Sequence, residues 1–510
     1  MEIKNILGID VGTTGIKAVV FDQFGNTLDT EYSEYETFFP NPDWVEQDPN
    51  TWWNVLKNVL HKLFLRVQAK NVCAIGVTGQ IASVVALDKD DSVLCNSFIW
   101  MDKRAVEECQ FLEEKMTADA LYNIIGTRPN VMFVIYKLMW LKKHQPEVFE
   151  KIDTVLQPKD YINFKLTGVK ASDYTCAAII HAFRLKELIW YQEAFDAAGI
   201  SPEIMPTICS ADEVIGYVTD ELMAEFGFSA QTPVVACGSD TTVAALGCGM
   251  INRGDAGLVI GTSSDVMAIS DTVALDSMQQ FGCYPYLYSG KYMMIAGGNS
   301  GGVALKWYRD TFFSYEKAEA DKTGESIYDN MLAPIENIPI GSEGLIFLPY
   351  MSGERSPVYN PNARGMFVGM GLSHTKEHFT RAIVEGISLS LMDRIIIAEN
   401  AGVEIDKIIV AGGGSKNDIW RQMLTDMIGK PTLVSKTEEA TSLGAAMMAA
   451  AGAGIYPSVE EACKNMSSTC NEMQPNSENK ERYALLYKLY KEAYQCNADY
   501  FDHLSALRKS

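Results

Sequence analysis

Two stretches of this chain share one pattern: an apolar run, a short turn of glycine and hydroxyl residues, and a second apolar run. The first stretch covers residues 6–22 and turns at residues 12–14, and the second covers residues 256–270 and turns at residues 261–263. Apolar runs on both sides of such a turn predict a β-hairpin. One hairpin near the start and another near the middle of 510 residues indicate two similarly built halves with phosphate held between them.

Both turns have the composition of a phosphate-binding loop. Glycine removes the Cβ that would block approach to backbone N–H groups, and threonine or serine adds hydroxyl donors. Asp10 ends the first apolar run, and a carboxylate there suits Mg²⁺, held directly or through water. Phosphate donors beside a metal-binding acid indicate chemistry on a nucleotide phosphate. An ordinary hairpin that carries Thr-Thr-Gly is the alternative that this stretch alone leaves open.

Composition narrows the class of protein. The 47% hydrophobic and 21% charged residues are typical of a soluble globular protein, and a net charge of −22 argues against a nucleic-acid binder, which usually has a basic face. The eleven cysteines form no Cys-x-x-Cys pair and the six histidines show no metal spacing, so we expect free thiols and no zinc. Without a signal-peptide pattern or an apolar run of roughly 20 residues, we expect a cytoplasmic protein that does not contact a membrane.

Strands and helices alternate along the first half, which predicts an α/β domain. Asp48 has the residue type and position of a helix N-cap. The run that ends at Asp240 is followed by small residues, which let a helix pack closely. We expect strands at residues 72–77, 84–88 and 232–240, a helix at residues 48–64 and a helix-rich segment at residues 117–150. A boundary between the hairpin-bearing halves gives predicted domains at residues 1–248 and 249–510.

A third glycine-rich turn, at residues 412–414, joins an apolar run to an amphipathic helix. Three glycines at a strand-to-helix turn let a flat ligand lie against the backbone, and a simple tight turn is the alternative. We expect a helix of small residues, beginning near residue 438, to pack beside this turn. Near the end, tyrosine and leucine residues between 483 and 494 share one helical face, which predicts a packing surface.

These blocks together resemble the FGGY carbohydrate kinases, members of the actin/sugar-kinase/Hsp70 superfamily. Six short blocks match in the family's order, and the similarity extends to about residue 455. The blocks are Gly8-Ile9-Asp10-Val11-Gly12-Thr13-Thr14 with Lys17, Thr78-Gly79-Gln80, Trp100-Met101-Asp102-Lys103-Arg104, Gly238-Ser239-Asp240, Gly261-Thr262-Ser263 and Gly412-Gly413-Gly414. Residues 348–357 and 382–387 resemble the family's C-terminal signature region and the helix after it.

The resemblance implies an α/β fold with two actin-like (ribonuclease H-like) domains flanking a central cleft, and ATP-dependent phosphorylation of a sugar or polyol with Mg²⁺. It implies that Asp10 lies near Mg²⁺ and that Asp240 is the general base, which accepts the proton of the substrate hydroxyl. A helix-capping acid is the alternative for Asp240. The residues implied at ATP and its phosphates are Gly12, Thr13, Thr14, Lys17, Gly261, Thr262, Ser263, Gly413, Gly414 and Asn417. Those expected at the sugar are Gln80, Ile81, Ala82, Asp102, Asp240 and Thr241.

Two of the sugar-side assignments have structural alternatives. Gln80 can both donate and accept hydrogen bonds to hydroxyls, and a loop-capping amide is its alternative. Asp102 can accept from hydroxyls, and a surface salt bridge with Arg104 is its alternative.

Within the family, the chain most resembles the xylulokinase branch, on residues 146–149, 157–161, 166–168 and 171–173. That branch usually has Met-His where this chain has Ile81-Ala82, and Asn where it has Thr241. A lost histidine changes the hydrogen bonding of a polyol pocket. D-xylulose, converted to D-xylulose 5-phosphate, is the leading expectation, and another ketose, a polyol or a sugar acid stays open.

Alternatives of another class are an actin- or Hsp70-like ATPase and a sugar-binding regulator. Asp240 after Gly238-Ser239, and no sign of a separate peptide-binding domain, argue against the ATPase, which would share the phosphate turns. Intact Asp10, Thr13, Thr14 and Asp240 argue against the regulator, and a homodimer is left open.

Overall fold

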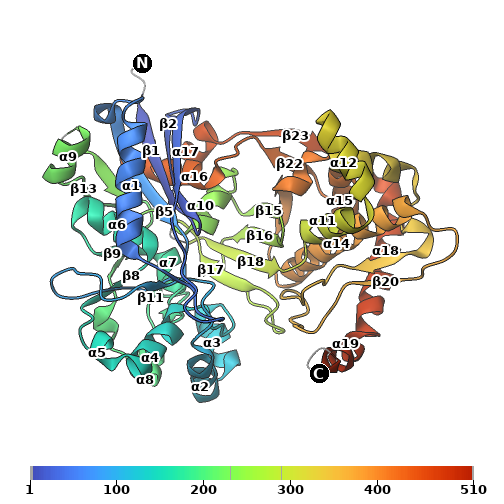
Figure 1. The fold of residues 1–510 in the computed structure, drawn as a ribbon, viewed down its shortest axis with the longest axis horizontal. Coiled ribbons are helices and arrows are strands. Elements are labelled where there is room, and N and C mark those ends of the chain that lie inside the picture. Colours follow the sequence, from blue (N-terminus) through green and yellow to red (C-terminus); the bar gives the residue numbers. More distant parts are fainter. Residues whose placement is uncertain (1–3, 230, 289, 508–510) are drawn as a thin grey trace.

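The computed structural model describes residues 4–229, 231–288 and 290–507. It has two lobes side by side, each built on a mixed β-sheet with helices packed against it (Figure 1). The N-terminal sheet has the order β13 (Val214–Tyr217), β14 (Pro233–Val235), β5 (Val72–Gly79), β1 (Asn5–Val11), β2 (Gly15–Asp22) and β3 (Thr27–Glu34). The C-terminal sheet has the order β17 (Gly282–Pro285), β18 (Tyr292–Gly298), β16 (Ser264–Ser270), β15 (Gly254–Ile260), β21 (Ile405–Ala411), β22 (Thr432–Ser435) and β23 (Thr469–Met473).

The two sheets repeat one arrangement around their hairpins. In the N-terminal sheet β1 pairs antiparallel with β2 and parallel with β5. In the C-terminal sheet β15 pairs antiparallel with β16 and parallel with β21. Both hairpins predicted from the sequence are therefore confirmed, and each places its glycine–hydroxyl turn at the end of a central strand.

Local signals also position several helices. The side chain of Asp48 accepts a hydrogen bond from the backbone N–H of Asn50 and caps α1 (Pro49–Leu63). This helix buries Trp52, Leu56 and Leu60 against the N-terminal sheet. The other helices of the first half are α2 (Val106–Met116), α3 (Ala118–Ile125), α4 (Val134–His144), α5 (Pro146–Phe149), α6 (Pro158–Thr167), α7 (Tyr174–Ala178), α8 (Gln192–Ala198), α9 (Asp220–Phe226) and α10 (Asp240–Gly247).

Short strands complete the first half. The apolar run at residues 84–88 forms β6 (Val85–Leu87), which pairs with β8 (Thr154–Leu156). A three-residue apolar strand carries little information about its partner, so the sequence predicted the strand but not this pairing. The remaining pairs are β4 (Glu46–Gln47) with β7 (Ser97–Phe98), β9 (Ala171–Asp173) with β12 (Thr207–Cys209), and β10 (Phe183–Arg184) with β11 (Ile189–Trp190).

The helix of small residues, α16 (Ala440–Gly452), belongs to the second half of the sequence but packs on the first half of the molecule. It contacts β1, β5 and α10, and Figure 1 shows it beside β1 and β2. A Cβ at Gly8 would lie 2.1 Å from the carbonyl oxygen of Ser442, and one at Gly444 would lie 1.8 Å from that of Val243. The small residues therefore serve contact with the N-terminal sheet rather than with the third glycine turn.

The other elements of the second half are helices and one short strand pair, β19 (Ile346–Leu348) with β20 (Met366–Val368). The tyrosine face predicted near the end is buried: Tyr483 and Tyr490 pack against Tyr350 in one apolar cluster. The helices are α11 (Gly302–Phe312), α12 (Ser314–Thr323), α13 (Ile327–Leu332), α14 (Lys376–Asn400), α15 (Asp418–Ile428), α17 (Val459–Met466), α18 (Lys480–Gln495) and α19 (Ala498–Ala506).

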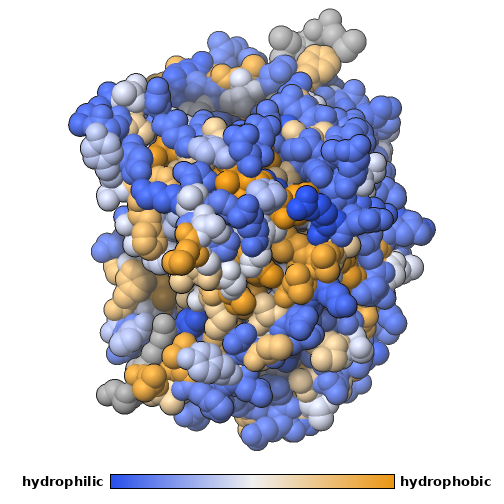
Figure 2. All heavy atoms as spheres, turned by 90° about the vertical axis from the view of Figure 1, so that its right-hand side faces the viewer, coloured by the Kyte–Doolittle hydropathy of each residue, from blue (hydrophilic) through white to orange (hydrophobic). Residues whose placement is uncertain are grey.

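On the face at the C-terminal end of the long axis, polar side chains surround apolar ones that gather across the middle (Figure 2). In the part of the chain that the structure describes, no helix combines the length and apolarity needed to span a bilayer. All eleven cysteines are free thiols.

Candidate active site

Hydrogen bonds from the N-terminal lobe hold the first phosphate turn, residues 12–14, in place. The backbone N–H of Gly12 donates to the carbonyl oxygen of Gly15 at 3.0 Å, and the Tyr35 hydroxyl donates to the carbonyl oxygen of Gly12. The amide of Gln47 donates to the carbonyl oxygen of Thr13 at 2.8 Å. The indole N–H of Trp100 donates to the hydroxyl of Thr13 at 3.0 Å. These contacts fix the turn, while the side chain of Thr14 is exposed.

The second phosphate turn, residues 261–263, is held in a similar way by the start of α11. The backbone N–H of Gly261 donates to the carbonyl oxygen of Ser263 at 3.0 Å. In return, the carbonyl oxygen of Gly261 accepts from the backbone N–H of Gly302 at 2.7 Å, and that of Thr262 accepts from Val303 at 3.2 Å. The helix N-terminus that abuts this turn adds a favourable field for an anion.

Asp10 lies near the end of β1, opposite Lys17 of β2. Its Oδ1 atom is buried and has no hydrogen-bond partner among the described residues. Burial and the negative charge of nearby Asp240 raise the pKa of Asp10 to about 7, and Lys17 partly offsets them. A carboxylate pair that is poorly neutralised and has a buried oxygen without a partner fits a divalent cation. Lys17 itself is paired with Glu439 at 2.9 Å.

Asp240 is the first residue of α10 and is half-buried. Its Oδ1 atom accepts from the backbone N–H of Thr241 at 2.6 Å and from the Thr241 hydroxyl at 3.1 Å. Burial raises the pKa of Asp240 to about 6, although the bonds from Thr241 oppose this rise. Both described hydrogen bonds reach Oδ1, so Oδ2 is the oxygen available to take a proton.

The residues predicted on the sugar side differ in how far they reach the surface. Ile81 and Thr241 are half-buried, whereas Gln80 and Ala82 are buried. The Gln80 amide donates to Gln47 at 2.8 Å, and its Oε1 atom is buried without a partner among the described residues. Ala82 packs in an apolar cluster of the N-terminal lobe.

Asp102 is fully buried, and both of its oxygens accept from the guanidinium of Arg104 at 2.7–3.0 Å. Its Oδ2 atom also accepts from the backbone N–H of Val45 at 2.7 Å. The pairing with Arg104 considered from the sequence is therefore present, but in the interior rather than at the surface. In this structure Asp102 holds the loop that carries Trp100, and its contact with a sugar stays a prediction.

A cavity of about 520 Å³ lies in the C-terminal lobe, a size that suits a small-molecule ligand. It joins the second phosphate turn to the third glycine turn and to α13. The amide of Asn417 donates to Asp329 at 3.1 Å, and its Oδ1 atom accepts from the backbone N–H of Trp420 and caps α15. The lining residues are Ile260, Gly261, Thr262, Gly302, Val303, Leu305, Lys306, Ser326, Tyr328, Asp329, Leu332, Gly413, Gly414, Lys416, Asn417 and Trp420.

This cavity brings together five residues that the sequence assigned to ATP: Gly261, Thr262, Gly413, Gly414 and Asn417. The first turn lies on the other lobe and does not line it. Sequence reasoning missed the residues that support the site through long-range contacts. Gln47 and Glu439 are two of them, and no local motif marks either.

Comparison with known proteins identifies the family. The model of the FGGY family of carbohydrate kinases, N-terminal domain, matches residues 5–247, and the model of its C-terminal domain matches residues 256–453. The chain belongs to the FGGY family of carbohydrate kinases. It is an α/β protein with two domains of the actin-like fold, as the sequence resemblance implied. Kinases of this family use ATP.

Relatives of this kinase carry two different substrate names. It is 31% identical to a xylulose kinase of Bacillus subtilis, with all of both chains covered. It is 30% identical to a gluconokinase of Bacillus licheniformis, covering 95% of this chain and 94% of the relative. The crystal structure of a gluconate kinase from Lactobacillus acidophilus superposes with a TM-score of 0.90 at 30% identity, covering 99% of this kinase and 100% of that chain.

Proposed function

We propose that this kinase transfers the γ-phosphoryl group of ATP to a primary hydroxyl of a small sugar, with Asp240 as the general base. The observation that carries the proposal is the placement of two acids with raised pKa values near each other, Asp240 at the start of α10 and Asp10 at the end of β1. One acid suits a metal ion and the other a proton. A primary hydroxyl is a weak nucleophile until a base within hydrogen-bond reach accepts its proton.

The donor binds across the two lobes in this proposal. The adenosine occupies the cavity beside Gly413, Gly414 and Asn417, and the phosphates lie between the two glycine–hydroxyl turns. Residues 12–14 donate from one side and residues 261–263 from the other. Most of the rate enhancement then comes from positioning and charge neutralisation around the γ-phosphate.

Asp10 is the residue that would hold Mg²⁺, directly or through water. When bound, the ion supplies charge neutralisation at the phosphates. The chain's own part is to place Lys17 opposite Asp10 and to leave one oxygen of Asp240 for the substrate proton. Thr241 holds the other oxygen of Asp240 and so orients the base.

D-xylulose is the proposed acceptor, and the xylulose kinase relatives support it. D-gluconate is the second candidate, because relatives named gluconokinase are equally similar to this chain. Ile81 and Ala82 stand where the xylulokinase branch usually has Met-His, which keeps the second candidate open. We further propose that the kinase works in the reducing cytoplasm, which its eleven free thiols support.

The test is ADP release with Mg-ATP and a panel of ketoses, aldoses, polyols and sugar acids. One compound should raise ADP release strongly, and D-xylulose is the expected one. Asp240→Asn should lower kcat by about 10²- to 10⁴-fold with that compound while ATP still binds. Asp220→Asn is the matched control, because Asp220 also begins a helix but is exposed on α9. An Asp240→Asn variant that keeps full turnover would show that Asp240 is not the base.

A further inference from the structure

The turn from β8 into α6 is a buried segment that contains charged side chains. Gln157, Lys159 and Asp160 are each at most 2% exposed. Charged groups enter a protein interior only when they are paired and hydrogen-bonded. The site described above uses none of these three residues, and their contacts lead in two directions.

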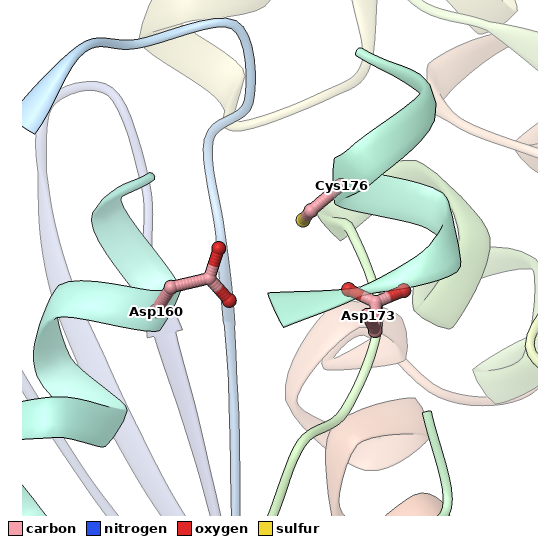
Figure 3. A group of neighbouring side chains, drawn as sticks. All are labelled: Asp160, Asp173 and Cys176. Atoms are coloured by element: carbon pink, nitrogen blue, oxygen red, sulfur yellow. The ribbon is translucent and has the colours of Figure 1, made fainter. Parts of the chain in front are cut away.

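The first direction leads to an acidic cluster. Asp160, Asp173 and Cys176 have ligand atoms within 4.8 Å of one another and come from α6, β9 and α7 (Figure 3). By spacing alone they could hold a metal ion. The ammonium of Lys159, however, lies 2.6 Å from Oδ1 of Asp160 and 3.0 Å from Oδ1 of Asp173. A lysine thus provides the cation, and the cluster is a buried ion-pair network.

Hydrogen bonds connect this network to the segment just before Asp240. Lys159 also donates to the carbonyl oxygen of Ala236 at 3.1 Å. Asp173 accepts from the backbone N–H of Thr175 at 2.7 Å, and the Thr175 hydroxyl oxygen accepts from the backbone N–H of Ser239 at 2.8 Å. Ala236 and Ser239 lie on the two sides of a bend at Cys237, where φ is 60°. A bend in this uncommon conformation needs support from its surroundings.

The second direction leads to the loop predicted to bind the sugar. Oε1 of Gln157 accepts from the backbone N–H of Ala82 at 2.8 Å, and its amide donates to the carbonyl oxygen of Cys176 at 2.6 Å. Ala82 has a φ of 57°, so its backbone is also in the left-handed region. Lys137 donates to the carbonyl oxygen of Ala82 at 2.6 Å and holds the same residue from its other side.

Two adjacent residues of α7 therefore anchor both sides of the site. Thr175 holds the residue before Asp240, and Cys176 holds Gln157, which holds the sugar loop. We propose that Thr175 and Gln157 are positioning residues that fix the general base and the sugar loop relative to each other through α7. The inference rests on the proposed role of Asp240. A misplacement of about 1 Å costs on the order of 10²-fold in rate, so the loss of either anchor should be measurable in turnover.

The base anchor is tested with Thr175→Val, which has nearly the same shape but leaves the Ser239 N–H without its acceptor. We expect kcat to fall by about 10- to 100-fold, with KM for ATP within about twofold of wild type. Thr175→Ser keeps the hydroxyl and should restore most of the turnover. Thr425→Val is the matched control: Thr425 is a fully buried threonine of α15 whose hydroxyl bonds to Thr432, so its loss lowers stability without changing kcat.

The sugar anchor is tested with Gln157→Met, which removes both hydrogen bonds at similar size. We expect KM for the sugar to rise about tenfold with a smaller change in kcat, the reverse of the Thr175→Val pattern. D-xylulose and D-gluconate serve as probes in parallel, each at saturating Mg-ATP. If Thr175→Val does not fold, Thr175→Ala removes the same acceptor and takes its place.

The outcomes separate the two proposals. An inactive Asp240→Asn with Thr175→Val at wild-type kcat would overturn the positioning role alone. A Thr175→Ser variant as slow as Thr175→Val would also overturn it, because the hydroxyl would then not matter. An Asp240→Asn that keeps its turnover would overturn the base assignment, and this inference with it. The supporting result is a lower kcat in Thr175→Val, recovery of kcat in Thr175→Ser, and an unchanged kcat in Thr425→Val.

Discussion

Replacing Asp10 with asparagine should make the metal-free kinase more stable at alkaline pH. The folded protein raises the pKa of Asp10 from the ordinary 3.8 to about 7, so the folded state holds this proton more tightly than the unfolded state does. Between these two values folding takes up a proton, and stability falls as pH rises. The loss begins above about pH 4 and is complete above about pH 7. Asparagine carries no charge and avoids it.

The expected change in the free energy of unfolding follows from the same shift in the pKa of Asp10. At 1.36 kcal/mol for each pH unit, a rise from 3.8 to about 7 corresponds to an upper bound of about 4 kcal/mol. Because Asp10 is only half-buried, water screens part of this, and about 2 to 4 kcal/mol is expected at pH 8. Near pH 4 the variant and the wild type should differ much less.

The assay is urea unfolding at several pH values from 4 to 8 in the presence of a chelator. Adding Mg²⁺ at pH 8 should then stabilise the wild type, because a bound cation neutralises the negative charge of Asp10. It should have little effect on Asp10→Asn, which has no charge at this position. Unfolding free energies that run parallel in the two proteins from pH 4 to 8 would refute this account of Asp10.

Two further predictions concern catalysis and the nucleotide cavity. Asp240 must be deprotonated to accept a proton, and its pKa is about 6. We therefore expect kcat/KM, measured by ADP release, to fall about tenfold for each pH unit below 6 and to level off above pH 6. A flat profile from pH 5 to 7 would contradict this. Gly414→Ala would place a Cβ 2.6 Å from Cγ2 of Ile260, so urea unfolding should give a loss of about 1 to 3 kcal/mol and the KM for ATP should rise. Gly413→Ala, which meets no atom within 4 Å, should leave stability unchanged, and equal effects of the two substitutions would argue against the packing explanation.

Features set by local sequence were predictable. Both hairpins follow from apolar runs around turn residues, and α1 follows from Asp48 and its helical periodicity. Such signals act over a few residues, so a single sequence displays them. The same holds for the buried tyrosine face of α18, where residues three and four apart lie on one side.

Features set by distant contacts were not predictable. The small residues of α16 indicate that another element packs closely against this helix, but they do not identify that element. In the structure it is the N-terminal sheet. The alternative considered for Asp102, a salt bridge with Arg104, was expected at the surface because charged residues usually are exposed, whereas here both residues are buried. Gln157 and Ala82 are 75 residues apart, and no local sequence pattern predicts the hydrogen bond between them.

The position of α16 has a consequence for how the protein is made. On a ribosome the strands of the N-terminal sheet emerge long before residues 440–452, yet one face of β1 and β5 is covered by that late helix. Until it is synthesised, the glycines at positions 8 and 76 and their apolar neighbours have no cover on that side. The N-terminal lobe therefore completes its folding only after nearly the whole chain has been synthesised. A fragment that ends at residue 248 should aggregate rather than fold as an independent unit.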